Sequence, residues 1–171
     1  MSAETIHPPV VKTFCWQDEA ATERFARALA AQPALKLAYI ELQGDLGAGK
    51  TTLVRHLLRA LGVQGRVKSP TYAVVEPYEL PDLHIWHFDF YRFSDPREWA
   101  DAGFRDIFAS PGLKIAEWPQ NAAGCVPLAD LLLQLTVADD ASRQVTLTAF
   151  TQLGATLLEG LDANAEQRAA A

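Results

Sequence analysis

The chain has 171 residues, of which 49% are hydrophobic and 21% charged, with a formal net charge of −6. This length and composition are typical of one globular domain, and the acidic balance disfavours general electrostatic binding to a phosphate backbone. No apolar run is long enough to cross a bilayer, and the first residues lack the pattern of a signal peptide. Cys15 and Cys125 lie far apart, which favours reduced thiols over a disulfide framework or a Cys-ligated metal site. We therefore expect a cytoplasmic protein without membrane contact.

The first third of the chain predicts two helices around one strand. Asp18 can cap a helix over 18–31, in which apolar side chains recur at helical spacing at Ala21, Phe25, Ala28 and Leu29. An apolar run over 37–42 predicts a strand. A second helix is expected over 50–61, with one leucine-rich face and Gly62 at its end.

The rest of the chain predicts mainly strands. They are expected at 72–78, 83–91, 113–116, 131–137 and 144–150. The first two are expected to form one hairpin, and the last two another. Asp95-Pro96-Arg97-Glu98 predicts a helix start, because it combines a capping side chain, a proline at the first helical position and a nearby carboxylate. The alanine-rich segment 151–171 is expected to be a loosely packed helical tail that frays at its end.

A glycine-rich segment lies between the first predicted strand and the helix that follows it. Gly44-Asp45-Leu46-Gly47-Ala48-Gly49-Lys50-Thr51 matches G-x-x-x-x-G-K-[ST], the phosphate-binding P-loop pattern. Glycines let consecutive backbone N–H groups turn toward an anion, and the helix directs its positive dipole end to the same place. The Lys50 ammonium would reach the terminal phosphates, and the Thr51 hydroxyl would coordinate Mg²⁺. The structural alternative is a tight turn with a chance Gly-Lys-Thr.

The predicted nucleotide-binding residues of this segment are Gly44, Asp45, Leu46, Gly47, Ala48, Gly49, Lys50, Thr51 and Thr52. Strands alternating with helices predict an α/β, P-loop NTPase-like fold, with a mostly parallel central sheet, antiparallel hairpin strands at its edges and helices on both faces. We expect residues 1–150 to form a single P-loop ATPase domain, with 151–171 as its tail.

Two carboxylates come at the ends of apolar strands, Asp89 in HIWHFDFYR and Glu117 in LKIAEWP. Ligands of open α/β sheets bind at the carboxyl ends of the strands, so both are candidates for holding Mg²⁺ or orienting water. The alternatives are a turn-capping role for Asp89 and an exposed edge position for Glu117. His87 shares a strand face with Asp89, and a packed histidine is a more common use of that residue than a catalytic base.

The segment Ser69-Pro70-Thr71 precedes a predicted strand. It is either a switch loop, in which Thr71 supplies a hydroxyl toward the γ-phosphate, or a proline-stiffened connector. Arg92 and Arg105 are weaker candidates for charge-stabilising arginines. Trp118 is either a flat wall for a base or a packing residue.

Several segments, taken in order, resemble the TsaE family, the small P-loop ATPases of bacterial threonylcarbamoyladenosine biosynthesis. They are DEAAT, GDLGAGKTT, VKSPTY, VEPY, HFDFYR, DPRE, GFRDIF and AEWPQ. The resemblance runs from about Asp18 to about Phe150. It implies binding of ATP or ADP with Mg²⁺, and work on TsaD and TsaB, through which alone the chain would reach tRNA.

The same resemblance implies roles for individual residues. It implies that Thr51 and Glu117 belong to the metal site, that Asp89 is the Walker B-like acid, and that residues 69–71 form a switch. It also implies that Glu19, Trp118 and Gln120 lie near the nucleotide. The chain departs from the common pattern at Phe90, where leucine is usual, and at Trp99 after Arg97-Glu98.

The expected function is that of a weak ATPase stimulated by partner proteins. Its expected catalytic residues are Lys50, Thr71, Asp89 and Glu117. Other functions remain open. A small-molecule kinase also uses a P-loop, but needs an acceptor pocket with an arginine-bearing lid, and no lid-like insertion occurs between Leu61 and Glu117. The sequence does not separate the ATPase from a nucleotide-gated scaffold with incidental hydrolysis. The lack of an Asn-Lys-x-Asp motif disfavours GTP.

Overall fold

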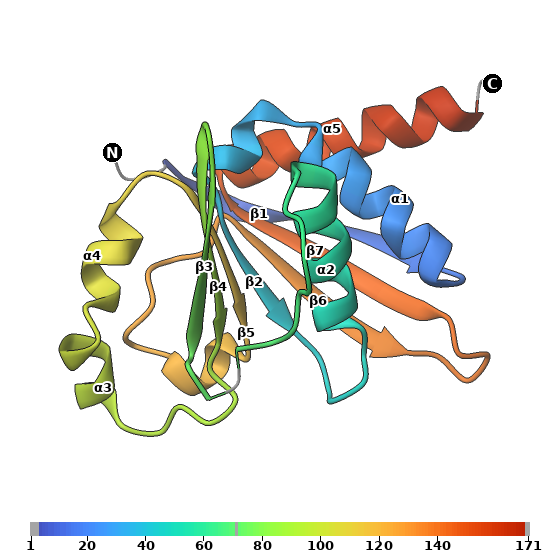
Figure 1. Ribbon diagram of the computed structural model, residues 1–171. Coiled ribbons are helices and arrows are strands. Elements are labelled where there is room, and N and C mark those ends of the chain that lie inside the picture. The colour runs from blue at the N-terminus through green and yellow to red at the C-terminus, as the bar shows by residue number, and fades with distance from the viewer. Residues whose placement is uncertain (1–3, 71, 170–171) are drawn as a thin grey trace.

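The computed structural model describes residues 4–70 and 72–169, which form one mixed sheet with helices on both faces (Figure 1). The strands are β1 (Thr5–Trp16), β2 (Tyr39–Gln43), β3 (Val75–Leu80), β4 (Leu83–Asp89), β5 (Leu113–Glu117), β6 (Leu131–Val137) and β7 (Arg143–Thr151). The helices are α1 (Glu19–Ala30), α2 (Lys50–Leu61), α3 (Pro96–Asp101), α4 (Phe104–Ala109) and α5 (Gln152–Ala169), with short 3₁₀ turns η1 (Pro33–Leu37) and η2 (Pro119–Ala122).

The seven strands lie in the order β1-β7-β6-β2-β5-β4-β3. The central strands β6, β2, β5 and β4 run parallel, whereas β1, β7 and β3 pair antiparallel with their neighbours. This arrangement confirms the predicted α/β class, with a parallel centre and antiparallel strands at both edges. It also brings the carboxyl ends of β2, β4 and β5 together at one end of the sheet, where ligands of such sheets bind.

One face of the sheet packs against α1, α2 and α5. Ile40 and Leu42 of β2 are buried in the same cluster as Leu57 of α2. The residues that alternate with them face the opposite side of the sheet. The opposite face packs against α3 and α4, in a cluster rich in aromatic residues. There the rings of Phe88 and Phe104 meet edge to face with centroids 5.3 Å apart. A shift of a central strand by one residue would move the side chains of each cluster to the opposite face, so the two different clusters fix the register of these strands.

Local signals explain where the helices begin and end. The Asp18 carboxylate accepts a hydrogen bond from the Ala21 amide at 2.9 Å, as expected for the cap of α1. The predicted bounds of α2 are confirmed, and Gly62 ends it in the left-handed region with φ 107°. Asp95 caps α3 through the Arg97 amide.

Several predicted bounds were wrong. The strand expected at 37–42 begins at Tyr39, because residues 33–37 form η1. Strands expected at 72–78 and 83–91 are β3 over Val75–Leu80 and β4 over Leu83–Asp89. The sequence interpretation also omitted β1 and α4. Both edge strands contain prolines: Pro8 and Pro9 lie in β1, and Pro77 lies in β3.

The C-terminal helix α5 packs more tightly than expected for a loose tail. Leu157, Leu158 and Leu161 are buried in the same cluster as the α2 leucines. Gly154 lies against β6, since a Cβ atom there would be 1.9 Å from the Asp130 carbonyl oxygen. The core therefore continues past residue 150 to at least Leu161. None of the helices in the described ranges combines the length and the apolar character that a membrane span requires.

Candidate functional site

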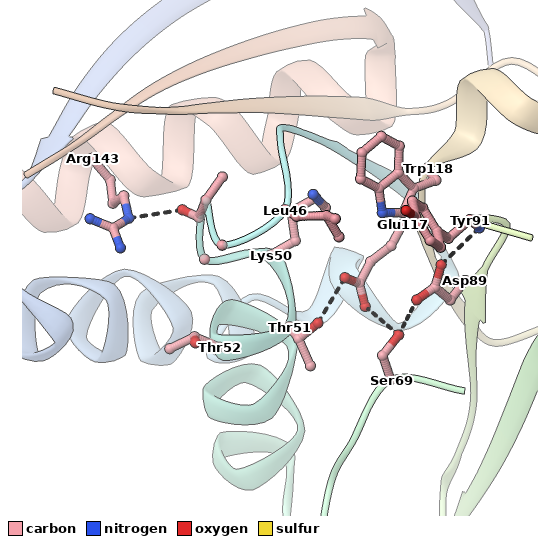
Figure 2. Close-up of a pocket in the computed structure, with 13 residues that line it drawn as sticks. Leu46, Lys50, Thr51, Thr52, Ser69, Asp89, Tyr91, Glu117, Trp118 and Arg143 are labelled. Atoms are coloured by element: carbon pink, nitrogen blue, oxygen red, sulfur yellow. Dashed lines mark hydrogen bonds between the residues drawn. The ribbon is translucent and has the colours of Figure 1, made fainter. Parts of the chain in front are cut away.

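A cleft of about 350 Å³ opens where β2, β4 and β5 end and α2 begins (Figure 2). Most of the residues singled out in the sequence are among those that line it. The full lining is Leu46, Gly47, Ala48, Gly49, Lys50, Thr51, Thr52, Ser69, Asp89, Tyr91, Glu117, Trp118 and Arg143. Gly44 and Asp45 belong to the same glycine-rich loop, Gly44–Gly49, immediately after β2. The parallel sheet explains this convergence, because it places the ends of separate strands side by side.

The glycine-rich loop needs glycine at two positions for different reasons. Gly49 has φ 108°, in the left-handed region, and is the N-cap residue of α2. At Gly44 a Cβ atom would lie 2.7 Å from the carbonyl oxygen of Leu135, so the loop approaches β6 too closely for any side chain. Within the loop, the Ala48 amide donates to the Asp45 carbonyl at 3.0 Å. The resulting turn leaves the first backbone amides of α2 at the cleft, a favourable place for an anion.

The Lys50 side chain folds back over the glycine-rich loop. Its ammonium group donates to the carbonyl oxygens of Gly44 and of Asp45, the latter at 3.1 Å, and lies 4.3 Å from the centre of the Trp118 ring. Burial lowers the pKa of Lys50, and the negative charges of Glu117, Asp89 and Asp45 oppose that shift. Lys50 therefore holds a buried cation at the cleft wall, close to both strand-end carboxylates.

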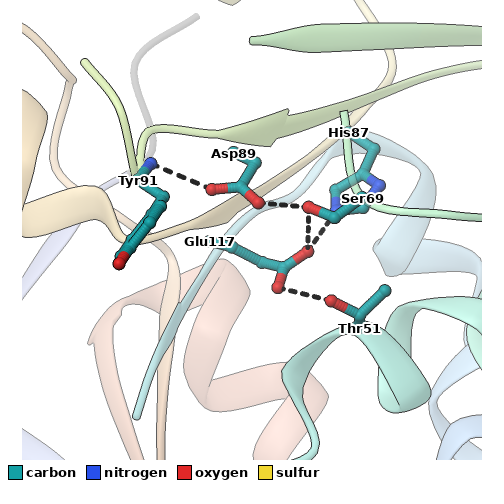
Figure 3. Close-up of polar contacts among 6 residues, drawn as sticks. All are labelled: Thr51, Ser69, His87, Asp89, Tyr91 and Glu117. Atoms are coloured by element: carbon teal, nitrogen blue, oxygen red, sulfur yellow. Dashed lines mark hydrogen bonds and ion pairs between the residues drawn. The ribbon is translucent and has the colours of Figure 1, made fainter. Parts of the chain in front are cut away.

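Both strand-end carboxylates are buried, with Asp89 4% and Glu117 2% exposed. They are register partners on the adjacent parallel strands β4 and β5. The Thr51 hydroxyl donates to Glu117 Oε1 at 2.9 Å (Figure 3). The Ser69 hydroxyl lies within reach of both, hydrogen-bonded to Asp89 Oδ2 and 3.3 Å from Glu117 Oε2. The alternative that Glu117 is an exposed edge residue is thereby excluded.

Asp89 has the turn-capping role considered for it and also lines the cleft. Its Oδ1 accepts a hydrogen bond from the Tyr91 amide at 2.9 Å, which caps the turn after β4. Its Oδ2 faces Ser69 and lines the cleft. Its carboxylate thus has one oxygen bonded to the backbone and the other bonded to Ser69 at the cleft.

His87 lies beneath this network, fully buried on β4. Its Nε2 is 2.6 Å from Glu117 Oε2. Its Nδ1 is buried and has no hydrogen-bond partner among the described residues. The expected packed histidine is thus in direct contact with a candidate metal-site residue.

A second cavity of about 320 Å³ adjoins the cleft on the far side of the glycine-rich loop. It shares Gly49, Thr52 and Arg143 with the cleft, and is otherwise lined by Trp16, Asp18, Glu19, Thr22 and Ala141. The Glu19 carboxylate contacts the His56 ring, with Oε1 2.9 Å from Nε2. The segment that includes Glu19 therefore borders the glycine-rich loop, and the place of Glu19 near a nucleotide stays a prediction from the TsaE resemblance.

Three other residues considered in the sequence, Gln120, Arg92 and Arg105, do not line the cleft. Gln120 is exposed in η2 and is not among the residues that line the cleft. Thr71 lies outside the described residues. Arg92 stacks on the Tyr72 ring at 4.6 Å, and Arg105 lines a separate cavity with Trp99 and Cys125. Cys15 and Cys125 are both free thiols.

Arg143 was missed in the sequence. It is the first residue of β7, and its Nε donates to the Ala48 carbonyl of the glycine-rich loop at 2.9 Å. A second donor of the guanidinium contacts the Ala141 carbonyl at 2.5 Å. No local pattern could reveal this, since Arg143 and Ala48 are 95 residues apart. The side chain adds a positive charge at the boundary between the two cavities.

The oxygen donors of the cleft fit a magnesium ion whose remaining ligands are phosphate oxygens and water. Among residues 4–70 and 72–169, no group of three or more His, Cys, Asp or Glu is arranged to hold a metal by itself. Thr51, Glu117 and Asp89 instead offer oxygen donors beside the loop. Mg²⁺ commonly binds through one or two carboxylates together with substrate phosphates and waters, so this sparse oxygen set suits it.

The fold and the site together define an α/β protein in which a glycine-rich loop, a buried lysine and two carboxylates meet at the carboxyl end of parallel strands. The family model described as "Threonylcarbamoyl adenosine biosynthesis protein TsaE" matches residues 16–145. The chain belongs to the TsaE family.

Individual relatives agree with this assignment. A Haemophilus influenzae protein named tRNA threonylcarbamoyladenosine biosynthesis protein TsaE is 43% identical over 136 residues, covering 80% of this chain and 85% of the relative. A Bacillus subtilis protein of the same name is 34% identical over 110 residues, covering 64% and 68% of the two chains. The crystal structure of Bacillus subtilis YdiB superposes with a TM-score of 0.76 at 26% identity, over 93% of this chain and 99% of that one.

Proposed function

We propose that this chain is a Mg²⁺-dependent ATP-binding and hydrolysing protein of the P-loop NTPase type, required for threonylcarbamoyladenosine modification of tRNA and acting on a TsaB–TsaD complex. Membership of the TsaE family supports the pathway. The observation that carries the ATPase proposal is the convergence of Lys50, Thr51 and Glu117 beside the glycine-rich loop.

Each residue has a task in this proposal. The loop amides and the N-terminus of α2 bind the phosphates, and Lys50 exchanges its contacts with the loop carbonyls for the terminal phosphate oxygens. Thr51 and Glu117 would hold Mg²⁺, which would neutralise negative charge on the phosphates. Asp89 and Ser69 orient water at the γ-phosphate. The cavity bordered by Trp16 and Glu19 receives the base and ribose.

Hydrolysis is expected to be slow in the isolated protein. Among the described residues, neither of the arginines first considered lines the cleft: Arg92 stacks on Tyr72 and Arg105 lines another cavity. Arg143 is committed to the loop carbonyl of Ala48. A transition-state arginine supplied by a partner raises the rate of such reactions by about 10³–10⁵. We therefore propose that the partner complex completes the site.

The chain is expected to reach tRNA only through those partners. Its net charge is −6, and non-specific binding to nucleic acid depends on neutralising several phosphates with basic side chains. The isolated protein should therefore bind tRNA weakly at physiological salt. A nanomolar, strongly salt-dependent affinity for tRNA in a filter or fluorescence titration would contradict indirect access.

The central test measures ATP hydrolysis by the pure protein, alone and with TsaB–TsaD, together with formation of the modified tRNA. We expect partner-stimulated turnover in the wild type and its loss in Glu117→Gln, which keeps the shape of the side chain but removes its charge. Glu98→Gln, on the exposed surface of α3, is the matched control and should behave as the wild type.

The same experiment separates the alternatives. A nucleotide-gated scaffold would support tRNA modification with a non-hydrolysable ATP analogue, whereas the proposed ATPase would not complete repeated cycles. A small-molecule kinase would transfer phosphate to an added acceptor without TsaB–TsaD. If the wild type neither binds ATP nor responds to the partners, the proposed function is wrong.

A further inference from the structure

Among the residues that the structure describes, the Glu117 side chain has three hydrogen-bonding neighbours, and they differ in their access to a ligand. Thr51 and Ser69 both line the cleft, so a bound nucleotide or metal can engage them. His87 is fully buried on β4 and is not among the cleft-lining residues. The contact between His87 Nε2 and Glu117 Oε2, at 2.6 Å, is therefore the one of the three that a ligand in the cleft does not reach.

The geometry also indicates which atom donates in this contact. A hydrogen on Nδ1 would leave Nε2 as a bare lone pair facing a carboxylate oxygen, and would itself be a buried donor without a partner among the described residues. A hydrogen on Nε2 instead makes a strong bond to the carboxylate. The opposite direction, from a protonated Glu117 to Nε2, would remove the negative charge that a hard cation requires.

We propose that His87 is a positioning residue for Glu117: it donates Nε2–H to Oε2 and thereby holds the carboxylate with Oε1 turned toward Thr51 and the cleft. This inference rests on the proposed function, in which Glu117 serves the metal. Without the histidine donor, a carboxylate only 2% exposed would lose a partner and rotate or move to find another. The buried Nδ1 is an energetic cost that an apolar side chain would avoid, which is consistent with a functional reason for histidine at this position.

Two variants of His87 separate donation from packing. In His87→Gln the side-chain amide nitrogen takes nearly the position of Nε2 and preserves a donor, whereas His87→Met fills similar space without one. His84→Gln and His84→Met are the matched controls, because His84 lies on the same strand but is exposed. The probes are a non-hydrolysable ATP analogue titrated at increasing Mg²⁺, and ADP titrated with a chelator and no Mg²⁺.

We expect His87→Met to need about tenfold more Mg²⁺ for the same affinity, the change that follows from losing one charge-assisted hydrogen bond. Its affinity for ADP without Mg²⁺ should stay within about twofold of the wild type, since the loop amides remain. In His87→Gln, the Mg²⁺ concentration needed for a given affinity should return close to the wild-type value. Wild-type behaviour of His87→Met, an equal loss with and without Mg²⁺, or no recovery in His87→Gln would each overturn the proposal.

A spectroscopic measurement on the wild type does not depend on variants that fold or on nucleotide binding. Long-range ¹H–¹⁵N correlation of the histidine rings should show a hydrogen on His87 Nε2. A ring protonated on Nδ1 alone would overturn the proposal. If the wild type binds no Mg²⁺–nucleotide at all, the proposed function fails, while this spectrum still decides whether His87 donates to Glu117.

Discussion

The Thr51 hydroxyl donates to Glu117 Oε1 at 2.9 Å and so joins the first turn of α2 to the last residue of β5. The bond fixes these two side chains relative to each other at the point where the metal is proposed to bind. Ser69 and His87 also contact Glu117, so the carboxylate is held from several sides. Such preorganisation reduces what binding must spend on ordering side chains.

Thr51→Val tests that relationship, because it keeps the shape of the side chain and removes the hydroxyl. We expect the Mg²⁺-dependent part of nucleotide affinity to fall about tenfold or more, since both a metal ligand and the Glu117 contact are lost. Isothermal titration with ADP, with and without Mg²⁺, separates the Mg²⁺-dependent part of the affinity from the part that does not need the metal. Thr156→Val, on the exposed side of α5, is the control. An unchanged Mg²⁺ dependence would contradict the role of Thr51.

Lys50→Ala should weaken ADP binding by about 1.5–3 kcal/mol, or about tenfold or more, because it removes a charge-assisted contact to phosphate. The variant should fold, since Lys50 bonds to loop carbonyls that water can reach in its absence. Lys36→Ala, which removes an exposed ion pair with Asp82, should leave affinity unchanged. Wild-type affinity in a folded Lys50→Ala protein would contradict the phosphate-binding assignment.

Arg143→Met should loosen the glycine-rich loop by removing the bond to the Ala48 carbonyl. The loss of one such hydrogen bond is worth about 1 kcal/mol, so we expect about fivefold weaker nucleotide binding. Arg59→Met, on the exposed last turn of α2, serves as the control. Equal affinities of the two variants for ADP would show that Arg143 does not support the loop.

Glu41 on β2 provides a pH-dependent test of stability. Burial raises the pKa of Glu41 above its ordinary value of 4.5, although a hydrogen bond from the Tyr39 hydroxyl at 3.1 Å opposes the shift. The neutral form is therefore favoured by folding, and its stabilising contribution is lost as the pH rises through the folded-state pKa. The side chain in Glu41→Gln is neutral at every pH, so the stability of this variant does not fall with the ionisation of residue 41.

The expected result is a melting temperature of Glu41→Gln that rises relative to the wild type as the pH increases from below the ordinary pKa of 4.5 toward neutrality, by about 2–4 °C for each kcal/mol of destabilisation that the substitution removes. Thermal melts followed by circular dichroism measure the difference at each pH. Glu159→Gln, an exposed position on α5, should show a flat difference. A difference for Glu41→Gln that falls with rising pH would contradict a raised pKa of Glu41 in the folded protein.

Elements with local signals were predictable from the sequence. The bounds of α2 follow from a glycine-rich start, a leucine-rich face and Gly62 at the end. The strand-end positions of Asp89 and Glu117 follow from apolar runs that stop at a carboxylate. By contrast, β1 was missed because most of its residues are exposed and two are prolines, and the alternation typical of a half-buried strand is confined to residues 12–16.

Contacts between distant segments were beyond a reading of local patterns. Arg143 reaches Ala48 only because β7 begins next to the glycine-rich loop, which depends on the strand order of the whole sheet. His87 meets Glu117 only because β4 and β5 pair with Asp89 opposite Glu117. The alanine content of the C-terminal segment led us to expect a loosely packed helix, yet three of its leucines are buried in the core.

The prolines at the two borders of the sheet limit how this molecule can associate. Pro8 and Pro9 fall in the part of β1 between Thr5 and Val10 where its register with β7 shifts, and Pro77 lies in β3 at the opposite border. Proline has no N–H to offer an incoming strand, so neither border presents an uninterrupted row of donors. Sheet extension by another chain, whether a partner or a second copy in a concentrated solution, is thereby disfavoured. Association is directed instead to side-chain surfaces, where recognition can be selective.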